Sequence, residues 1–550
     1  MKKQPVVALG IDAGDPVLLE KWMDEGELPH FSKLLKGGGY GRLENIGYYK
    51  AETPWTTFLT GCMPLTTEYW TPIQFQQGSY RAEEVEAYDF HRHPPFYAIG
   101  DDYRVAIFDV PQTTLSADTN GPQVLAWGAH SPQTPSHSSP AGLLDEINEK
   151  YGKHPALHKD HGAWWDREYL HFLLKATLTG IERRTEVVKD WLKSEPWDLL
   201  LTVYGETHST GHDFWHLSDR SSPLYQSPGD VGFDCDPMLE VFKKVDNSIG
   251  CILSELPDDG HLVVFSVHGS GNNVTDVPSM VFLPELMYRF SFPGCEQLAP
   301  GTVGDDVGDM QDPGAGQWQN LIYGLRRERN IGVRYLRRFL PRKVFKALEP
   351  YLPVDPLGVK SIKETRKSGM DMSWQPSMWY AHLWPKMKAF ALPSFSEGYV
   401  RINVEGREPE GIVSAADYQA TCDELAAEIR ELRNPRTGGK LVKKVVQTRT
   451  AAELDDPSKP GADLVVVWND DEPADVCDHS KWGRVGPVPY RRSGSHRARG
   501  FWAAIGPRIQ ENSKLPDGHA VDLAPTILDL MGASPKTQMD GKSLFGLLPR

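Results

Sequence analysis

The sequence predicts an α/β fold organised around a mostly parallel sheet, and three features of the chain indicate it. Short apolar runs typical of buried strands recur along the chain. They lie at residues 5–11, 104–109, 198–204, 261–267 and 463–468. Longer segments with helical periodicity separate them, as at 163–194 and 236–256. Strands that alternate with helices form βαβ units, in which polar residues at the carboxyl ends of the strands line a common cleft.

The 550 residues exceed what one small core needs, so an insertion or a second domain is expected. Residues 276–390 stand out, because a loop rich in Gly and Asp is followed by a basic run and then by a stretch rich in Pro and Trp. We therefore predict a core made of residues 1–275 and 391–550, with 276–390 inserted as a cap. The basic run, 326–346, holds nine Lys and Arg in 21 residues. It fits a solvated helix face, a wall that attracts an anionic substrate, or a helix at a membrane surface.

Charge and composition narrow the class of partner. A net charge of −15 argues against binding to a nucleic-acid polymer and leaves a small anionic substrate as the expected partner. No apolar stretch approaches the length of a membrane span, and the start of the chain lacks the apolar region of a signal peptide. The six cysteines are scattered without a C-x-x-C pair, which fits free thiols in a reducing compartment. We expect a cytoplasmic protein, and the sequence does not predict its oligomeric state.

Metal-ligating side chains follow several of the predicted strands. Asp12 ends the first run, where it serves either as a metal ligand or, like Asp15, as the cap of the next helix. The segment 205–216, GETHSTGHDFWH, is dense in histidines and acids. On a helix, His208 and His212 share one face at a spacing that can chelate zinc, and Glu206 is a further candidate ligand.

Two more histidines lie at comparable places. His268 follows the run 261–267 and precedes a flexible turn, which suits a ligand or a core histidine bonded to a carbonyl oxygen. His496 lies in a basic loop before another apolar run. Arg492 and Arg497 flank it and are candidates for holding an oxyanion, although an exposed basic loop explains them equally well.

Thr53 is the candidate nucleophile. The segment 51–61, AETPWTTFLTG, predicts a short helix that begins at Pro54 with Thr53 as its N-cap. Capping alone explains this residue. A hydroxyl at such a position also suits an incoming phosphate, and a neighbouring metal ion lowers its pKa, so that Thr53 is a candidate metal ligand as well.

These segments, in this order, resemble the alkaline phosphatase superfamily, nearest to its type I phosphodiesterase/nucleotide pyrophosphatase branch. Further matching stretches are LPHFSKLL at 28–35, FLTG at 58–61, VAIFDVP at 105–111, VRINVEGREPEGIV at 400–413, DLAPTILDLMG at 522–532 and MDGKSL at 539–544. The resemblance implies a central sheet between helices, a two-metal centre that often holds zinc, and attack by a hydroxyl on phosphate or sulfate esters. It makes Asp12 a bridging carboxylate, and His212, His268 and His496 ligands.

The chain departs from the family pattern at three places. His208 stands where the family usually has an Asp four residues before the His212 equivalent, and Val267 stands where it has an Asp before the His268 equivalent. Counting back from Gly61 without gaps places the nucleophile at Ala51, which cannot attack, and a two-residue deletion places it at Thr53. Lost carboxylates favour zinc at the His-rich pocket and weaken the other pocket, so one or two ions are expected.

The sequence thus predicts a metal-dependent hydrolase of phosphate esters, of the phosphodiesterase or nucleotide pyrophosphatase kind, with a Thr nucleophile. The expected metal is zinc, and manganese is an alternative. A second interpretation is a group-transferring biosynthetic enzyme, in which an alcohol or amine replaces water. A third is a protein that binds a metal or ligand without catalysis.

Overall fold

The computed structural model describes residues 3–547 except 129, 131–133, 161, 312, 315, 329, 349, 350, 353 and 354. The contacts of the chain divide it into two compact units. The first unit comprises Met1–Pro72, Val85–Asn273 and Arg492–Arg550, and the second comprises Ile73–Glu84 and Val274–Arg491. The second unit therefore joins the segment 276–390 to residues 391–491. The predicted division into a catalytic core and a cap stays a prediction.

The first unit is built on a large sheet whose centre is parallel. Its strands are, in spatial order, β21 (Ser513–Lys514), β2 (Gly39–Glu44), β20 (Arg499–Ile505), β10 (His261–Ser266), β1 (Val6–Ile11), β9 (Leu199–Tyr204), β5 (Gly100–Phe108), β7 (Gln123–Leu125) and β8 (His137–Ser139). The five strands from β10 to β7 pair in parallel, whereas β20 pairs antiparallel with both of its neighbours. All six residues of β1 are buried, as expected of a strand covered on both faces.

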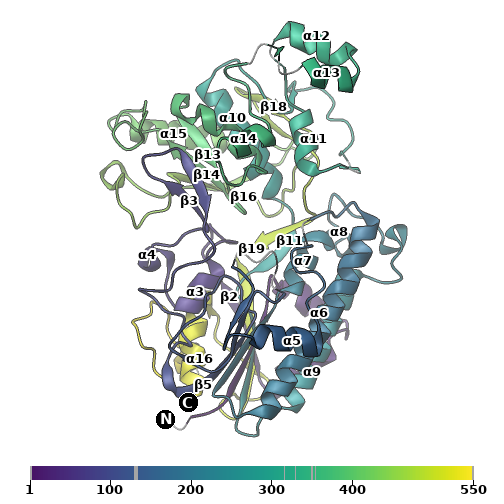
Figure 1. Cartoon of the computed structure of the whole chain (residues 1–550), viewed down its shortest axis with the longest axis vertical. Helices are drawn as coiled ribbons and strands as arrows, with labels where there is room; N and C mark the ends of the chain where they lie inside the picture. The colour runs from purple at the N-terminus through teal and green to yellow at the C-terminus, as the bar shows by residue number, and fades with distance from the viewer. Residues whose placement is uncertain are drawn as a thin grey trace. The chain divides into compact units, whose positions relative to one another are not determined.

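Helices cover both faces of this sheet (Figure 1). Because side chains alternate along a strand, Val7 and Leu9 of β1 belong to one core and Val6 and Ala8 to the other. The first core is closed by α1 (Pro16–Asp24), α2 (Pro29–Gly37), α6 (Arg167–Ser194) and α9 (Pro237–Ser254). The second core is closed by α3 (Pro54–Thr60) and α16 (Leu523–Met531). The predicted α/β class, with a mostly parallel sheet between helices, is confirmed.

One predicted strand belongs to another sheet. The runs at 5–11, 104–109, 198–204 and 261–267 form β1, β5, β9 and β10 as expected. The run at 463–468 forms β16 (Leu464–Trp468), but the prediction that it joins the parallel sheet is wrong. An apolar run reports that a strand is buried and carries no information about its partners.

The second unit contains this antiparallel sheet, in the order β13 (Ala389–Leu392), β14 (Gly398–Ile402), β16 and β15 (Val442–Gln447). Its longer helices are α10 (Leu283–Ser291), α12 (Ile331–Phe339) and α15 (Tyr418–Ile429). The six cysteines of the whole chain lie among the described residues of both units and are free thiols. Within the residues that the structure describes, no helix combines the length and the apolar character needed to cross a membrane.

Candidate metal centre

The candidate centre lies at the carboxyl edge of the parallel strands. β1, β9 and β10 are neighbours in register, so the residues that follow them emerge side by side. Asp12 follows β1, α7 (Glu206–Asp213) begins two residues after β9, and His268 follows β10. A fourth segment is placed by an antiparallel strand pair, because β11 (Gly269–Asn272) pairs with β19 (Gly494–Arg497) and places Ser270 opposite His496. Topology thus joins residues nearly five hundred positions apart.

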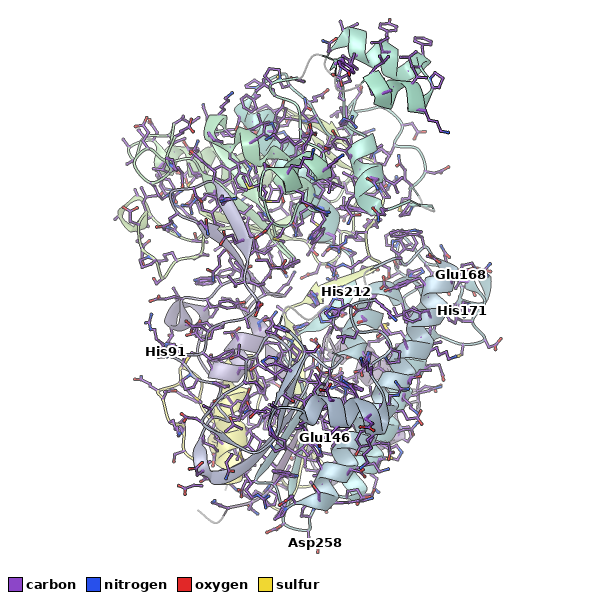
Figure 2. The ribbon with its side chains drawn as sticks, viewed as in Figure 1. His91, Glu146, Glu168, His171, His212 and Asp258 are labelled. Carbon is purple, nitrogen blue, oxygen red and sulfur yellow. The ribbon has the colours of Figure 1, made fainter. Side chains whose placement is uncertain are left out.

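Four imidazole rings converge at this edge, and we call them the histidine cluster: His208, His212, His268 and His496. His208 and His212 are one turn apart on α7, and their ring centroids are 4.7 Å apart. The ring of His496 lies 4.6 Å from that of His208 and 4.8 Å from that of His212. His268 lies 4.6 Å from His496 on the other side. His212 is visible beside β11 and β19 (Figure 2).

Asp12 is the one carboxylate that touches this group among the described residues. Its Oδ2 lies 3.0 Å from Nδ1 of His208, and its Oδ1 lies 3.1 Å from Nε2 of His268. Burial by itself raises the pKa of Asp12, but the two imidazoles outweigh it and hold that pKa well below its usual range. The alternative of a helix cap does not apply to Asp12, because Asp15 accepts the amide hydrogens of Val17 and Leu18 at the start of α1.

Burial holds three of the imidazoles in the neutral form that binds metals. Burial lowers the pKa of His208 to about 4, and the nearby Asp12 carboxylate opposes this only in part. Burial also lowers the pKa of His212 and of His496 well below the usual range. Within the described chain, Nδ1 of His268 and Nδ1 of His496 are buried without a hydrogen-bond partner. Neutral imidazoles beside one carboxylate, some with unused nitrogen atoms, form a donor set that fits zinc.

The backbone and an arginine select the tautomer of His212. Its Nδ1 lies 2.9 Å from the carbonyl oxygen of Gly494, so Nδ1 carries the hydrogen and Nε2 carries the lone pair. Nη1 of Arg492 lies 2.9 Å from this Nε2. Arg492 therefore borders the cluster. Arg497 is bound elsewhere, because its guanidinium donates to the carbonyl oxygens of His496 and Asn272 at 3.0 and 2.7 Å.

Thr53 precedes α3 as expected, but its hydroxyl does not cap the helix. It is fully buried, has helical backbone angles and donates a 3.0 Å hydrogen bond backward to the carbonyl oxygen of Tyr49. The same turn does touch the cluster, because the indole of Trp55 donates to Oδ1 of Asp12 at 3.1 Å. Helix α3 is therefore tied to the same carboxylate that contacts His208 and His268.

Glu206 lies in a different cluster. Its Oε1 is 3.2 Å from Nη2 of Arg184 and 3.3 Å from Nε2 of His154, and all three side chains are buried. Arg184 also contacts Asp109 at 2.7 Å, and Asp109 accepts the amide hydrogens of Trp127 and Gly128. We call Arg184, Glu206, Asp109 and His154 the arginine hub. It ties the first residue of α7 to α6 and to the loop after β7.

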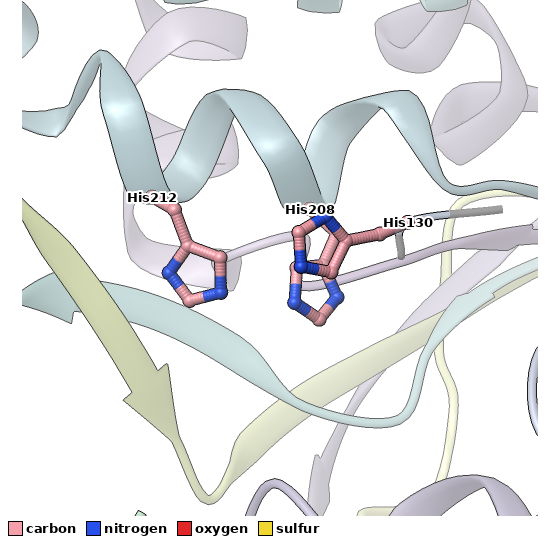
Figure 3. Close-up of side chains that lie close together, drawn as sticks. All are labelled: His130, His208 and His212. Atoms are coloured by element: carbon pink, nitrogen blue, oxygen red, sulfur yellow. The ribbon is translucent and has the colours of Figure 1, made fainter. Parts of the chain in front are cut away.

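His130 was not predicted from the sequence, yet it lies against the cluster. Its ring stacks on that of His208 at 4.3 Å and 17°, and His212 lies beyond (Figure 3). Its Nδ1 is 2.6 Å from Oδ2 of Asp160, which Ser209 also contacts. Ligand atoms of His130, His208 and His212 lie within 4.8 Å of one another, so His130 is a further candidate ligand. Its ring would have to turn to share an ion with His208, because the lone pairs of two stacked rings lie in nearly parallel planes. The strand before it, β7, is only three residues long, so no apolar run marks the position.

Comparison with known protein families gives one match. The family model described as "Type I phosphodiesterase / nucleotide pyrophosphatase" matches residues 6–287. This stretch contains all five strands that pair in parallel and the residues from Asp12 to His268. A search of curated protein sequences finds no match.

Solved structures are similar over nearly the whole chain. Murine ectonucleotide pyrophosphatase/phosphodiesterase 5, inactive and in complex with AMP, is 12% identical over 98% of both chains, with a TM-score of 0.46. Phosphonoacetate hydrolase from Sinorhizobium meliloti 1021, in complex with phosphonoformate, is 11% identical over 96% of both chains, also with a TM-score of 0.46. Neither similarity assigns a role to a residue of this chain.

Proposed function

The chain belongs to the type I phosphodiesterase/nucleotide pyrophosphatase family, within the alkaline phosphatase superfamily, and we propose that it is a metal-dependent phosphodiesterase with a threonine nucleophile. The family match supports hydrolysis of phosphate esters in general. Diesters and nucleotide-like pyrophosphates are the proposed substrates.

One observation carries the proposal. The imidazoles of His208, His212 and His496 converge next to Asp12 and His268 at the carboxyl edge of a parallel sheet. Ligands of α/β enzymes bind at such edges. A purely structural histidine cluster would satisfy its ring nitrogens with protein partners, whereas two Nδ1 atoms here have none in the described chain.

We assign His208, His212 and His496 to one zinc ion, and Asp12 with His268 to the side where a second ion would bind. Zinc or manganese bound there supplies a positive charge that stabilises non-bridging phosphoryl oxygens and a developing alkoxide. The chain supplies the remaining steps. Asp12 orients His208 and His268, and the carbonyl oxygen of Gly494 keeps the lone pair of His212 on Nε2.

In the proposed reaction, the hydroxyl of Thr53 loses its proton and its oxygen forms a bond to phosphorus, while the bond from phosphorus to the ester oxygen breaks and the leaving group takes up a proton. Water then breaks the bond between phosphorus and the Thr53 oxygen, which regains its proton as the phosphate product leaves. The hydrogen bond from Thr53 to Tyr49 must exchange for this to happen, and the Trp55–Asp12 contact supports the assignment because it holds the same turn at the cluster.

Arg492 has a proposed role in binding the substrate. It donates to the Nε2 lone pair that a metal ion would use, so metal binding requires its guanidinium to find another acceptor. A phosphoryl oxygen is such an acceptor and matches the geometry of a guanidinium.

The test combines metal content with a substrate screen. Protein purified without chelator is analysed for metals and assayed with chromogenic phosphate monoesters and diesters. We expect at least one zinc per chain and faster turnover of diesters, with loss in chelator and recovery in zinc. A metal content near zero that does not rise after zinc or manganese is added would contradict the proposal. Transfer to an added alcohol that outpaces hydrolysis would favour the group-transferring alternative.

A further inference from the structure

The helix pair formed by α12 (Ile331–Phe339) and α13 (Arg342–Leu348) exposes an unusual amount of apolar surface. Ile331, Tyr335 and Phe339 repeat every four residues along one face of α12, and they are 62%, 60% and 71% exposed. Tyr335 and Phe339 stack at 6.0 Å and 7°. Aromatic side chains of this size cover apolar surface in most soluble domains, so a row of them in water indicates a binding surface.

The exposed residues are concentrated rather than scattered. Thirteen large hydrophobic residues are exposed in the described chain, and seven of them lie within 331–351. They are Ile331, Tyr335, Leu336, Phe339, Val344, Leu348 and Tyr351. The helix pair already has its own internal contact, because Val333 and Phe345 are buried while these seven are not. The apolar face is therefore a second surface, left over after the two helices have packed.

The charge of the segment is opposite to that of the chain. Residues 330–348 contain six Lys and Arg and no Asp or Glu, whereas the whole chain has a net charge of −15. A solvated helix face, the first interpretation of this run, has no need of exposed aromatic rings. An acidic surface that also accepts apolar side chains matches both features.

We propose that α12 and α13 form a docking surface for the anionic face of a phospholipid bilayer. The apolar row inserts among the acyl chains near the headgroups, and Lys and Arg side chains reach the headgroup phosphates while their methylene stems cover apolar surface. The helices lie in the plane of the interface and do not span it, in agreement with their short lengths of 9 and 7 residues. A symmetric contact between two copies is disfavoured, because it would bring two such basic segments together.

The test is flotation of the full chain with vesicles of phosphatidylcholine alone and of phosphatidylcholine with phosphatidylglycerol. We expect at least tenfold stronger binding to the anionic vesicles and weakening at high salt. Tyr335→Glu with Phe339→Glu should reduce this binding at least tenfold. Arg334→Glu with Arg338→Glu should abolish the preference for anionic vesicles.

Matched controls separate docking from folding. Leu65→Glu with Ile412→Glu makes the same chemical change at exposed positions elsewhere and should leave binding unchanged. All variants should retain the wild-type melting temperature and the wild-type rate with a soluble chromogenic diester. Folded wild-type protein that does not float, or that binds both vesicle types equally, overturns the proposal. So does self-association in solution that the Tyr335/Phe339 variant abolishes without any effect on vesicles, since the face would then be an interface between copies.

Discussion

Two buried clusters meet at helix α7, and they differ in the charged and neutral groups that they bring together. In the arginine hub, one guanidinium bonds to two carboxylates, and a histidine contacts one of these. In the histidine cluster, several neutral imidazoles surround one carboxylate and leave ring nitrogens without partners in the described chain. Glu206 and His208 are two residues apart, so on a helix they point about 200° from each other. The same short segment thus contributes to both clusters.

This difference suggests a structural role for the arginine hub and a metal-binding role for the histidine cluster. Paired charges in a dry interior fix the position of the elements that carry them, and removing one partner strands the other. Buried ring nitrogens without hydrogen-bond partners lower the stability of the fold, and such a cost is expected where these atoms bind an ion. We therefore expect damage to the histidine cluster to appear in metal content and turnover, and damage to the hub to appear in stability.

The largest expected effect is on turnover. His212→Ala should remove bound zinc and lower kcat for a diester by about 10³-fold or more, because it deletes one of the three proposed zinc ligands. Its unfolding curve without metal should stay close to that of the wild type. Metal analysis, steady-state kinetics and urea unfolding measure the three quantities. The matched control is His91→Ala, an exposed histidine that should change none of them. Full metal content in His212→Ala would break the contrast.

The next effect concerns Thr53 and distinguishes a catalytic role of its hydroxyl from a structural one. Thr53→Ala should lower kcat by about 10³-fold if Thr53 attacks phosphorus, with metal content unchanged. If its hydroxyl serves only the bond to Tyr49, the change costs about 1 kcal/mol of stability and leaves turnover intact. Thr53→Ser keeps a hydroxyl and should remain active. An active Thr53→Ala enzyme would point to direct attack by water.

A third variant examines the hub. Arg184→Met leaves two buried carboxylates without their cation and should lower the free energy of unfolding by about 3–5 kcal/mol. Arg183→Met changes the neighbouring position, which bonds to a carbonyl oxygen near the surface, and should cost less than about 1 kcal/mol. Urea unfolding of both proteins gives the comparison. Equal stability of the two variants would show that the hub contributes little to the fold.

Part of this organisation was accessible from the sequence. Apolar runs located four central strands, and the residues after them include Asp12, His208, His212 and His268, which the fold brings together. The path of β16 was not accessible, because burial does not specify a partner strand. Glu206 was assigned to the cluster because its spacing from His208 carries no direction until the start of the helix is known. His130 was missed because the strand before it is too short to leave a pattern.

The smallest expected effect concerns His216, the third histidine of the segment 205–216, which belongs to neither cluster. It is buried in α8 (Trp215–Ser218) with its ring 5.1 Å from that of Trp164, and burial lowers its pKa from 6.5 to about 3. Below pH 6.5, His216 becomes protonated in the unfolded chain but stays neutral in the folded chain. The free energy of unfolding should therefore fall by up to about 1.4 kcal/mol per pH unit between pH 6.5 and 3 from this residue alone.

His216→Phe keeps an aromatic ring against Trp164 and removes the titrating group. The variant should lose less stability than the wild type when the pH falls from 7 to 5, with the same zinc content at pH 7. Urea unfolding of both proteins at a series of pH values in the presence of zinc measures the difference, because the cluster histidines contribute equally to both proteins and cancel in the comparison. An unchanged pH dependence would show that His216 has the same pKa in the folded and the unfolded protein. A loss of zinc would instead show that His216 supports metal binding together with the histidine cluster.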